Sequence, residues 1–361
     1  MQIGIVGLPF SGKTTLFETL LAQKSKDLSG KYKHETERGI VHVPDNRLPQ
    51  LTAIFKPLKE VPATIEYIKV PGLDKEGNKG AGLPNQFLAN TKTVDLILIM
   101  VRAFKNDIFP HPMGSINPDR DIRFINSEFL LNDLSIVENR LEKLRKLVMK
   151  TQNEKDKKEV EVLSKCQEIL EKEKPIRELN LTDQEARIIK GFQFLSAKPL
   201  LYVLNIGETE IEKTAAMLEA YQQHVQEKCA MVALSAEIEK EIAQLDANDA
   251  TEFLKDLHIS EPATMKLIRV SYNLLGLISF FTVGEDECRA WTVRTNTRAQ
   301  NAAGIIHSDL EKGFIRAEVV PWQTLVEAGS LAACKEKGLL RLEGKDYIVQ
   351  DGDIISVRFN V

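Results

Sequence analysis

A glycine-rich segment near the N-terminus constrains the fold more than any other part of the sequence. Gly7 to Thr14 reads GLPFSGKT and fits the pattern G-x-x-x-x-G-K-[ST]. An apolar run at 3–6 comes directly before it, and the sequence at 15–23 favours a helix directly after it. A strand, such a loop and a helix in that order are typical of an α/β domain that binds phosphate where the helix begins. The segment therefore predicts an α/β fold with a nucleoside triphosphate site at its first loop.

The residue types in this loop suit the chemistry of a triphosphate. Glycines let the loop curl so that successive backbone N–H groups face phosphate oxygens. Lys13 is placed to reach the β- and γ-phosphates, and the Thr14 hydroxyl is placed to ligate Mg²⁺. We predict that Lys13 acts in catalysis and that Thr14 is the metal ligand. The predicted nucleotide-binding residues of this segment are Gly7, Pro9, Phe10, Ser11, Gly12, Lys13, Thr14 and Thr15.

Two later strand ends carry the residues expected to hold the base. Apolar runs at 199–205 and 231–235 each lead into a polar loop, and NIGE at 205–208 stands where a GTPase places N-K-x-D. Because Glu208 replaces the Asp that reads guanine and the Lys is absent, guanine specificity is not expected. The alternative is that these are ordinary loop residues. The predicted base-binding residues are Asn205, Ile206, Glu208, Ser235 and Ala236.

The apolar pattern divides the chain into three kinds of region. Short apolar runs at 3–6, 64–70 and 96–101 suit a parallel sheet covered on both faces. Apolar residues spaced three and four apart then predict two long antiparallel helices, either for a partner or as a solvated face. Alternating residues near the C-terminus predict a small β-rich module. The predicted domains are 1–130 and 191–277 for the two parts of the sheet domain, 131–190 for the helical insertion and 278–361 for the last module.

Composition narrows the functional class. The 48 basic and 52 acidic residues give a net charge of −4, which excludes a strongly basic nucleic-acid coat. The four cysteines lie far apart without a CxxC spacing, so neither a zinc knuckle nor a disulfide scaffold is expected. No apolar stretch reaches 18 residues, so no membrane span is expected. We expect a cytoplasmic protein that is a monomer.

Several motifs give the chain a resemblance to the YchF, or Obg-like ATPase, family over nearly its whole length. They are GLPFSGKT at 7–14, VPDNRL at 43–48, GLPNQFL at 82–88, NIGE at 205–208, RAWTV at 289–293, AGIIH at 303–307, FIRAEV at 314–319 and LEGKDYIV at 342–349. The resemblance implies a P-loop NTPase G-domain with a mostly parallel sheet and helices on both faces. It further implies an inserted antiparallel α-helical hairpin and a C-terminal β-grasp domain, the ubiquitin-like TGS domain.

The same resemblance implies a function. It implies that ATP is bound in preference to GTP, and that the ribosome or its subunits are the partner. RNA contact is implied through a cleft lined by the helical arm and the TGS domain. An RNA-binding module led by the TGS domain alone is not favoured, because 278–361 holds 10 basic and 12 acidic residues.

Three positions depart from the family pattern and bear on the metal. Lys69 stands in the Asp position of D-x-x-G, where a cation repels Mg²⁺ and accepts no hydrogen bond from metal-bound water. Lys33 stands where the family has its metal-sensing Thr, although Thr36 is near enough to substitute. Phe10 replaces an Asn associated with potassium-assisted hydrolysis, so weak potassium stimulation is expected. Altered Mg²⁺ dependence is expected, with a tolerated strand-end substitution as the alternative.

The sequence also predicts which residues take part in hydrolysis. Gly72 is predicted to contact the nucleotide, and Leu73 follows it where Ras-like GTPases place the Gln that orients water, so turnover should be slow. The resemblance implies that His111 helps instead, and the alternative is a solvated loop histidine. The predicted function is a slow ATPase that acts as a ribosome-associated switch. The alternative is a nucleotide-binding adaptor with little or no hydrolysis, because Lys69 and Phe10 depart from the pattern.

Overall fold

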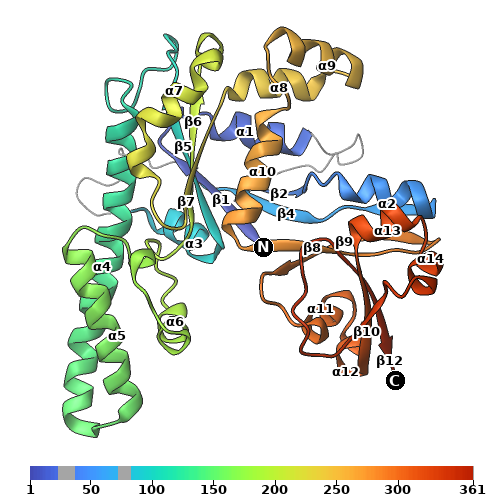
Figure 1. Cartoon of the computed structure of the whole chain (residues 1–361). Coiled ribbons are helices and arrows are strands. Elements are labelled where there is room, and N and C mark those ends of the chain that lie inside the picture. Colours follow the sequence, from blue (N-terminus) through green and yellow to red (C-terminus); the bar gives the residue numbers. More distant parts are fainter. Residues whose placement is uncertain (23–36, 72–82, 361) are drawn as a thin grey trace. The chain divides into compact units, whose positions relative to one another are not determined.

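The chain folds into two compact units. The computed structural model describes residues 1–22, 37–71 and 83–360 (Figure 1). The first unit comprises Met1–Ile40 and Glu66–Thr264, and the second comprises Val41–Ile65 and Met265–Val361. The chain therefore leaves the first unit after Ile40, contributes a short stretch to the second, and returns. Gly72, Lys33, Thr36 and Leu73, which the sequence singled out, lie outside the described residues.

A largely parallel sheet forms the centre of the first unit. The strand order is β2-β4-β1-β5-β6-β7, and β1 pairs in parallel with both β4 and β5, β5 with β6, and β6 with β7. Every residue of β6 is buried, as expected for a strand covered on both faces. The α/β class is confirmed. The strands are β1 (Gln2–Gly7), β2 (Glu37–His42), β4 (Thr64–Lys69), β5 (Leu96–Ala103), β6 (Leu200–Ile206) and β7 (Cys229–Leu234).

Helices pack on this sheet through one buried apolar cluster, to which Val6, Ile99 and Leu204 belong. The helices of the first unit, apart from its arm, are α1 (Lys13–Ala22), α3 (Asn85–Thr93), α6 (Asp183–Lys190), α7 (Thr214–Ala220), α8 (Ala236–Gln244) and α9 (Ala247–Asp256), with α10 (Ala263–Leu274) continuing into the second unit. Short 3₁₀ turns are η2 (Ile176–Glu178), η3 (Glu208–Lys213) and η4 (Gln222–His224). None of the helices described is long and apolar enough to cross a membrane.

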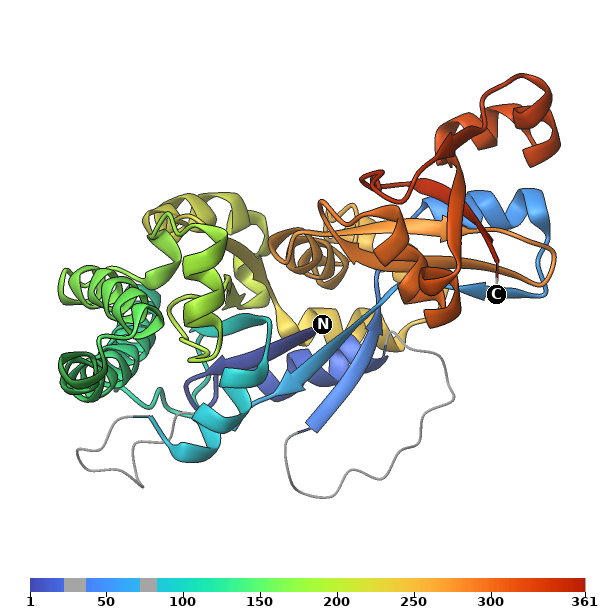
Figure 2. The same cartoon turned by 90° about the horizontal axis from the view of Figure 1, so that it is seen from below.

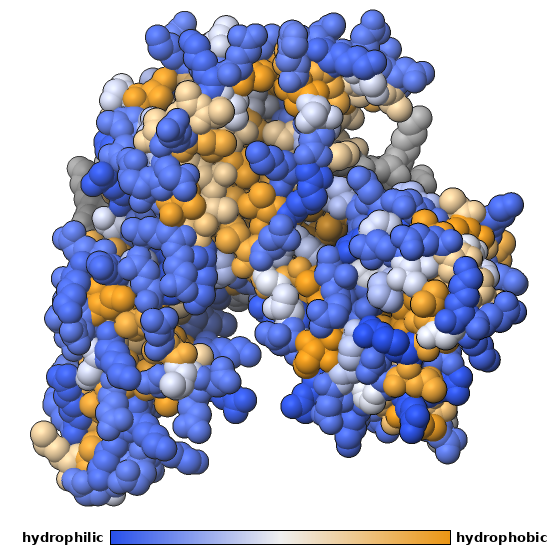
Figure 3. Space-filling view, viewed as in Figure 1, coloured by the Kyte–Doolittle hydropathy of each residue, from blue (hydrophilic) through white to orange (hydrophobic). Residues whose placement is uncertain are grey.

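Two long helices form an arm on the first unit. α4 (Pro118–Thr151) and α5 (Glu154–Glu171) lie side by side in both views (Figures 1 and 2). α4 starts well before the apolar seam because Asn117 caps its N-terminus and Pro118 suits its first turn. The seam buries Val137, Leu141 and Leu144 of α4 against α5, while the arm surface seen in Figure 3 is mainly hydrophilic. The predicted helical hairpin is thus present.

A mixed sheet forms the second unit. The strand order is β11-β10-β12-β8-β9-β3, and β12 pairs with β8 in parallel while β8 and β9 are antiparallel. The strands are β3 (Lys59–Val61), β8 (Leu277–Thr282), β9 (Glu287–Arg294), β10 (Phe314–Pro321), β11 (Arg341–Glu343) and β12 (Asp353–Phe359). The helices are α2 (Arg47–Phe55), α11 (Ala299–Ile306), α12 (Ser308–Lys312), α13 (Trp322–Ala328) and α14 (Leu331–Glu336).

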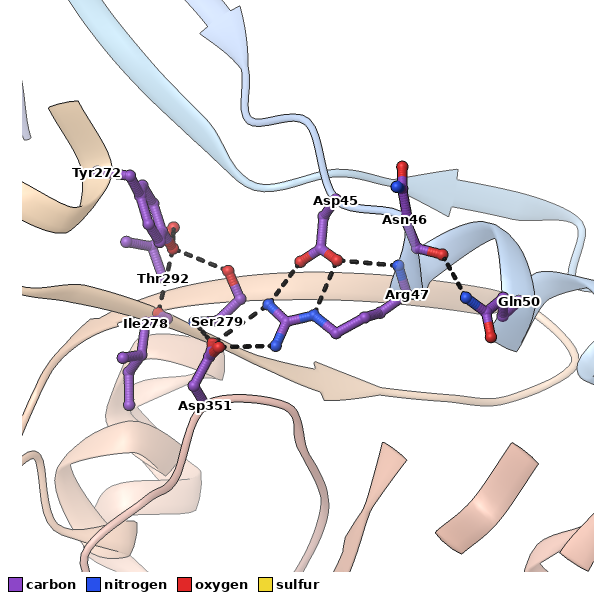
Figure 4. A network of polar contacts seen from close by, with 9 residues as sticks. All are labelled: Asp45, Asn46, Arg47, Gln50, Tyr272, Ile278, Ser279, Thr292 and Asp351. Atoms are coloured by element: carbon purple, nitrogen blue, oxygen red, sulfur yellow. Dashed lines mark hydrogen bonds and ion pairs between the residues drawn. The ribbon is translucent and has the colours of Figure 1, made fainter. Parts of the chain in front are cut away.

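The early stretch of the second unit is held to the C-terminal stretch by a polar network (Figure 4). The Arg47 guanidinium donates to both oxygens of Asp45 at 2.8 Å and to Asp351 Oδ2 at 2.8 Å. Asp351 Oδ1 also accepts the Ser279 backbone N–H at 2.9 Å. Burial disfavours the charge on Arg47, but the two carboxylates outweigh this effect and raise its pKa. The β3 strand adds to the attachment by pairing in parallel with β9.

These units divide the chain differently from the predicted domains. The sequence placed 1–130 in a single domain, whereas Val41–Ile65 belongs with the C-terminal stretch. The predicted boundary at 278 also lies downstream of Met265, where the second unit resumes. The reason is physical: the partners of 41–65 lie more than 200 residues away in the chain, where a local pattern does not reveal them.

Candidate functional site

The loop between β1 and α1 requires glycine at two positions. Gly7 has φ +152° and Gly12 has φ +95°, which are values that residues with a side chain rarely adopt. A Cβ at Gly7 would lie 2.4 Å from the Met100 carbonyl oxygen, and one at Gly12 would lie 2.2 Å from Asn205 Nδ2. The glycines of the motif therefore let the loop pack directly against β5 and β6.

Polar groups of this loop face inward. Lys13 Nζ donates to the carbonyl oxygens of Gly7 at 3.0 Å and Leu8 at 2.8 Å. Ser11 Oγ is buried and has no hydrogen-bond partner among the residues that the structure describes. The loop thus holds a lysine on its own carbonyls and a buried hydroxyl without a partner, which suits a loop built to surround an anion.

A cavity of about 570 Å³ lies beside the loop within the first unit. It joins the start of α1 to the C-terminal ends of β5, β6 and β7, where ligands bind in open α/β sheets. Of the predicted residues, it is lined by Phe10, Ser11, Gly12, Lys13, Thr14, Thr15, Asn205, Ile206, Glu208, Ser235 and Ala236. Gly7 and Pro9 belong to the loop but do not line the cavity. The structure therefore brings together the two groups that the sequence assigned to phosphates and to base.

Asn205 fastens two of the loops around this cavity. Its Nδ2 donates to the Ser11 carbonyl oxygen at 3.0 Å, and its Oδ1 accepts the Ala236 backbone N–H at 3.0 Å. The side chain is 4% exposed. Asn205 therefore spans from the phosphate loop to the start of α8, with both ends of its amide engaged by the protein.

The C-terminal end of β5 adds residues that the sequence reading missed. Arg102 is 3% exposed, donates to the carbonyl oxygens of Phe104 and Asn106, and keeps Nη1 without a partner among the described residues. Burial lowers the pKa of this guanidinium. Other missed lining residues are Lys105, Phe109, Glu237, Ile238 and Glu241. These residues could have been predicted from topology alone, because a parallel strand next to β1 must end at the same edge of the sheet as the phosphate loop.

Phe10 lies at the cavity in an unusual conformation. Its φ is +60°, and its ring stacks on Phe109 with 5.2 Å between the ring centroids. Both rings are about half exposed, at 54% and 48%. Because a phenyl ring carries no oxygen or nitrogen, the Phe10 side chain offers no polar ligand to a monovalent ion.

His111 lies apart from the cavity lining. Its Nε2 is 2.9 Å from Asp121 Oδ2, and its Nδ1 accepts the Met113 backbone N–H at 3.2 Å. The residue is 8% exposed, so the alternative of a solvated loop histidine is wrong. Burial lowers the pKa of His111, and Arg120 adds to this effect although Asp121 opposes it. His111 is thus a buried side chain held by Asp121 of α4.

The residues described do not fit a bound Mg²⁺ ion. Thr14 is exposed at the cavity and offers a hydroxyl, but β4, the strand beside β1, ends at Lys69 rather than at a carboxylate. Lys69 Nζ lies 2.7 Å from Glu37 Oε1. Within 1–22, 37–71 and 83–360, no group of three His, Cys, Asp or Glu side chains could hold a metal ion.

Two family models match the chain. Residues 2–206 match a model described as a 50S ribosome-binding GTPase, and residues 277–360 match the YchF-GTPase_C model, described as a protein of unknown function. The Ribosome-binding ATPase YchF of Bacillus subtilis (strain 168) is 42% identical over 368 aligned positions, covering 100% of both chains. The chain belongs to the YchF family.

Other YchF relatives agree in length and fold. The Ribosome-binding ATPase YchF of Escherichia coli O157:H7 is 39% identical and covers 100% of this chain and 99% of its own. The solved structure of the Schizosaccharomyces pombe YchF GTPase has a TM-score of 0.89 and 32% identity, covering 99% of this chain and 97% of that one. The names of these relatives differ in the nucleotide, since the bacterial proteins are called ATPases and the yeast protein a GTPase.

Proposed function

We propose that this protein binds a nucleoside triphosphate in the 570 Å³ cavity and hydrolyses it slowly, as a ribosome-associated conformational switch. The observation that carries the proposal is the joining of the phosphate loop to the ends of β6 and β7 in one cavity. Membership of the YchF family supports it, because the bacterial relatives carry the name Ribosome-binding ATPase. We expect the protein to act in the cytoplasm and to be a monomer.

The base end of the cavity supports ATP over GTP. Ile206 stands where a GTPase has a lysine, and Glu208 replaces the shorter Asp that reads guanine. A carboxylate there accepts N–H groups of either purine, so the guanine-specific geometry is lost while adenine keeps a donor. Ser235 and Ala236, in the loop after β7, also line the cavity, and we propose that they pack against the base.

The loop residues would supply the catalysis that the cavity allows. Backbone N–H groups of the loop would position the phosphates, and the Lys13 ammonium would stabilise charge on the β- and γ-phosphate oxygens. To do so, Lys13 must exchange the carbonyls of Gly7 and Leu8 for phosphate oxygens. His111 would have to leave Asp121 to act on water, so turnover by the isolated protein is expected to be slow.

A nucleotide-binding adaptor with little hydrolysis is the second candidate. Two observations favour it: His111 is buried outside the cavity lining, and Lys69 is ion-paired with Glu37. Both candidates share nucleotide binding and differ only in turnover.

Calorimetric titration of the full chain with ATP and with GTP tests the shared step. ATP is expected to bind more tightly, and Lys13→Ala to weaken ATP binding at least about tenfold, which corresponds to the loss of a charge-assisted contact. Lys146→Ala is the matched control, because Lys146 lies exposed on the arm, where it pairs with Glu142. Equal ATP affinity in wild type and Lys13→Ala would contradict the site.

Ribosome sedimentation and phosphate release separate the two candidates. The switch predicts that ribosomes raise ATP turnover and that bound nucleotide alters cosedimentation. The adaptor predicts nucleotide-dependent cosedimentation with turnover that ribosomes leave unchanged. Absence of cosedimentation in every nucleotide state would exclude both roles at the ribosome. Treating the ribosomes with nuclease would show whether RNA contributes to the contact.

A further inference from the structure

Lys69 lies at the edge of the sheet where the phosphate loop begins. β4 pairs in parallel with β1, with Lys69 level with Ile5, and the Val70 N–H donates to the Ile5 carbonyl oxygen at 3.0 Å. Gly7, the start of the loop, is two residues further along β1, or roughly 6.6 Å at the usual strand rise. Because neighbouring strands lie about 4.8 Å apart, Gly7 is roughly 8 Å from the Lys69 backbone, and the four-carbon stem of a lysine covers this distance to within the length of a hydrogen bond. The ammonium of Lys69 is therefore within reach of an anion bound at the start of the loop.

The present partner of Lys69 is a carboxylate on the edge strand of the sheet. Glu37 is the first residue of β2, which lies at the end of the strand order. The side chain of Lys69 is 20% exposed and that of Glu37 is 38% exposed. The pair is thus partly buried and consists of one cation and one carboxylate. A triphosphate, which carries several charges and many acceptor oxygens, is a stronger partner for the same ammonium.

We propose that Lys69 is the built-in cation of this nucleotide site, in place of a bound divalent metal ion, and that triphosphate binding moves its ammonium from Glu37 to phosphate oxygens. The proposal deepens the proposed function and rests on it, because a nucleotide must bind. Two consequences follow. Nucleotide affinity is independent of Mg²⁺, and nucleotide binding releases the Glu37 carboxylate on β2.

The test is calorimetric titration of ATP into the full-length protein, in excess EDTA and in excess Mg²⁺. The wild-type affinities in the two buffers are expected to agree within about threefold. Lys69→Met, which keeps the stem and removes the charge, is expected to weaken binding in EDTA about tenfold. Glu37→Gln removes the competing carboxylate and is expected to strengthen binding in EDTA about two- to fivefold.

A charge reversal gives the sharpest contrast. Lys69→Asp restores a carboxylate at the end of β4, so its binding is expected to be weak in EDTA and to gain at least about tenfold from Mg²⁺. Arg38→Gln is the matched control, because Arg38 is also on β2 and forms a looser pair with Glu66 at 3.8 Å. Its ATP affinity in both buffers is expected to match the wild type.

Three outcomes decide the proposal. Wild-type binding that needs Mg²⁺, or Lys69→Met binding as tightly as wild type in EDTA, would overturn the metal-free site while leaving the proposed function intact. Failure of ATP and GTP to bind in either buffer would overturn both. Circular dichroism verifies that each variant folds, and should Lys69→Met fail to fold, the near-isosteric Glu37→Gln decides by its gain in affinity.

Discussion

Asn205 illustrates what a single residue contributes to this molecule. The sequence placed it at the end of a strand, 192 residues after Lys13, and assigned it to the base. The structure shows its amide donating to Ser11 and accepting from Ala236, so that it fixes the geometry of two loops. Spacing along the chain predicted where the side chain lies, but not which atoms its two ends contact. That choice depends on loops brought together by the sheet.

Replacing Asn205 with alanine is therefore expected to affect the site through its shape. The change leaves the Ala236 N–H without its acceptor, a loss of about 1–3 kcal/mol in the free energy of unfolding for a buried group. ATP affinity is expected to fall about tenfold as the loop loses its support. Urea unfolding and calorimetry measure the two effects. Asn126→Ala, which breaks a similar pair with Tyr202, should lower stability without changing ATP affinity, and an equal loss of affinity in both variants would refute the role.

His111 gives the protein a dependence on pH. Because burial lowers its pKa in the folded state, the unfolded chain binds a proton first as the pH falls. The stability that buried His111 contributes is thus expected above the usual histidine pKa and is expected to be lost as the pH falls below it. Thermal unfolding between pH 7.5 and 5 is expected to show this decline, and His111→Gln is expected to flatten it. An unchanged slope in the variant would assign the decline to other groups.

The site residues that could not be predicted from the sequence were missed for one reason. Arg102 and Phe109 line the cavity because β5 ends beside the phosphate loop, and no motif marks them. Gly7 and Gly12, by contrast, follow directly from the motif, since close approach of β5 and β6 leaves no space for a Cβ. A motif encodes contacts with a phosphate, whereas cavity walls depend on which strands are neighbours.

At the scale of elements, the periodic apolar patterns predicted the strands and the helical arm. They did not predict the residue at which each element begins. The apolar runs correspond to β1, β4, β5, β6 and β7, and the heptad-like spacing corresponds to the buried seam between α4 and α5. The start of α4 at Pro118 was missed, because its first turns pack on the sheet through Ile122 and Ile125. Periodicity marks a buried stripe, while caps and prolines decide where a helix begins.

The α2 element depends on one ion network for its attachment. Arg47→Ala is expected to lower the free energy of unfolding by about 1–3 kcal/mol, because Asp45 and Asp351 lose a common partner in a half-buried place. Chemical denaturation of the full chain measures the loss. Arg38→Ala is the control, with an expected change within about 0.5 kcal/mol for its exposed pair. Equal effects of the two substitutions would show that the network adds nothing specific.

At the scale of the whole molecule, each unit is assembled from two separate stretches of chain. The sequence reading recovered the sheet domain, the helical insertion and a β-rich end, but it treated the end as a contiguous module. Val41–Ile65 supplies an edge strand and a helix to that unit. The predicted domain limits differ from the limits of the two units where the chain crosses between them.

Removal of residues 265–361 is therefore expected to damage more than the C-terminal unit. α2 packs with β9 and α13 in the second unit, and its Leu48 and Leu51 are 2% and 0% exposed. In the shortened chain, the stretch 41–65 is expected to become the first site of proteolysis, as mass spectrometry of a timed digest would show. The full-length chain provides the reference digest. Continued protection of 41–65 in the shortened protein would contradict the assignment of this stretch to the second unit.

The order of synthesis gives the split second unit a further consequence. About 200 residues separate Ile65 from Met265, so at 5–20 residues per second the stretch 41–65 leaves the ribosome roughly 10–40 s before the rest of its unit. Throughout that interval α2 and β3 have no sheet to join. The nascent chain must therefore keep the apolar residues of 41–65 from other partners until its last quarter has been translated.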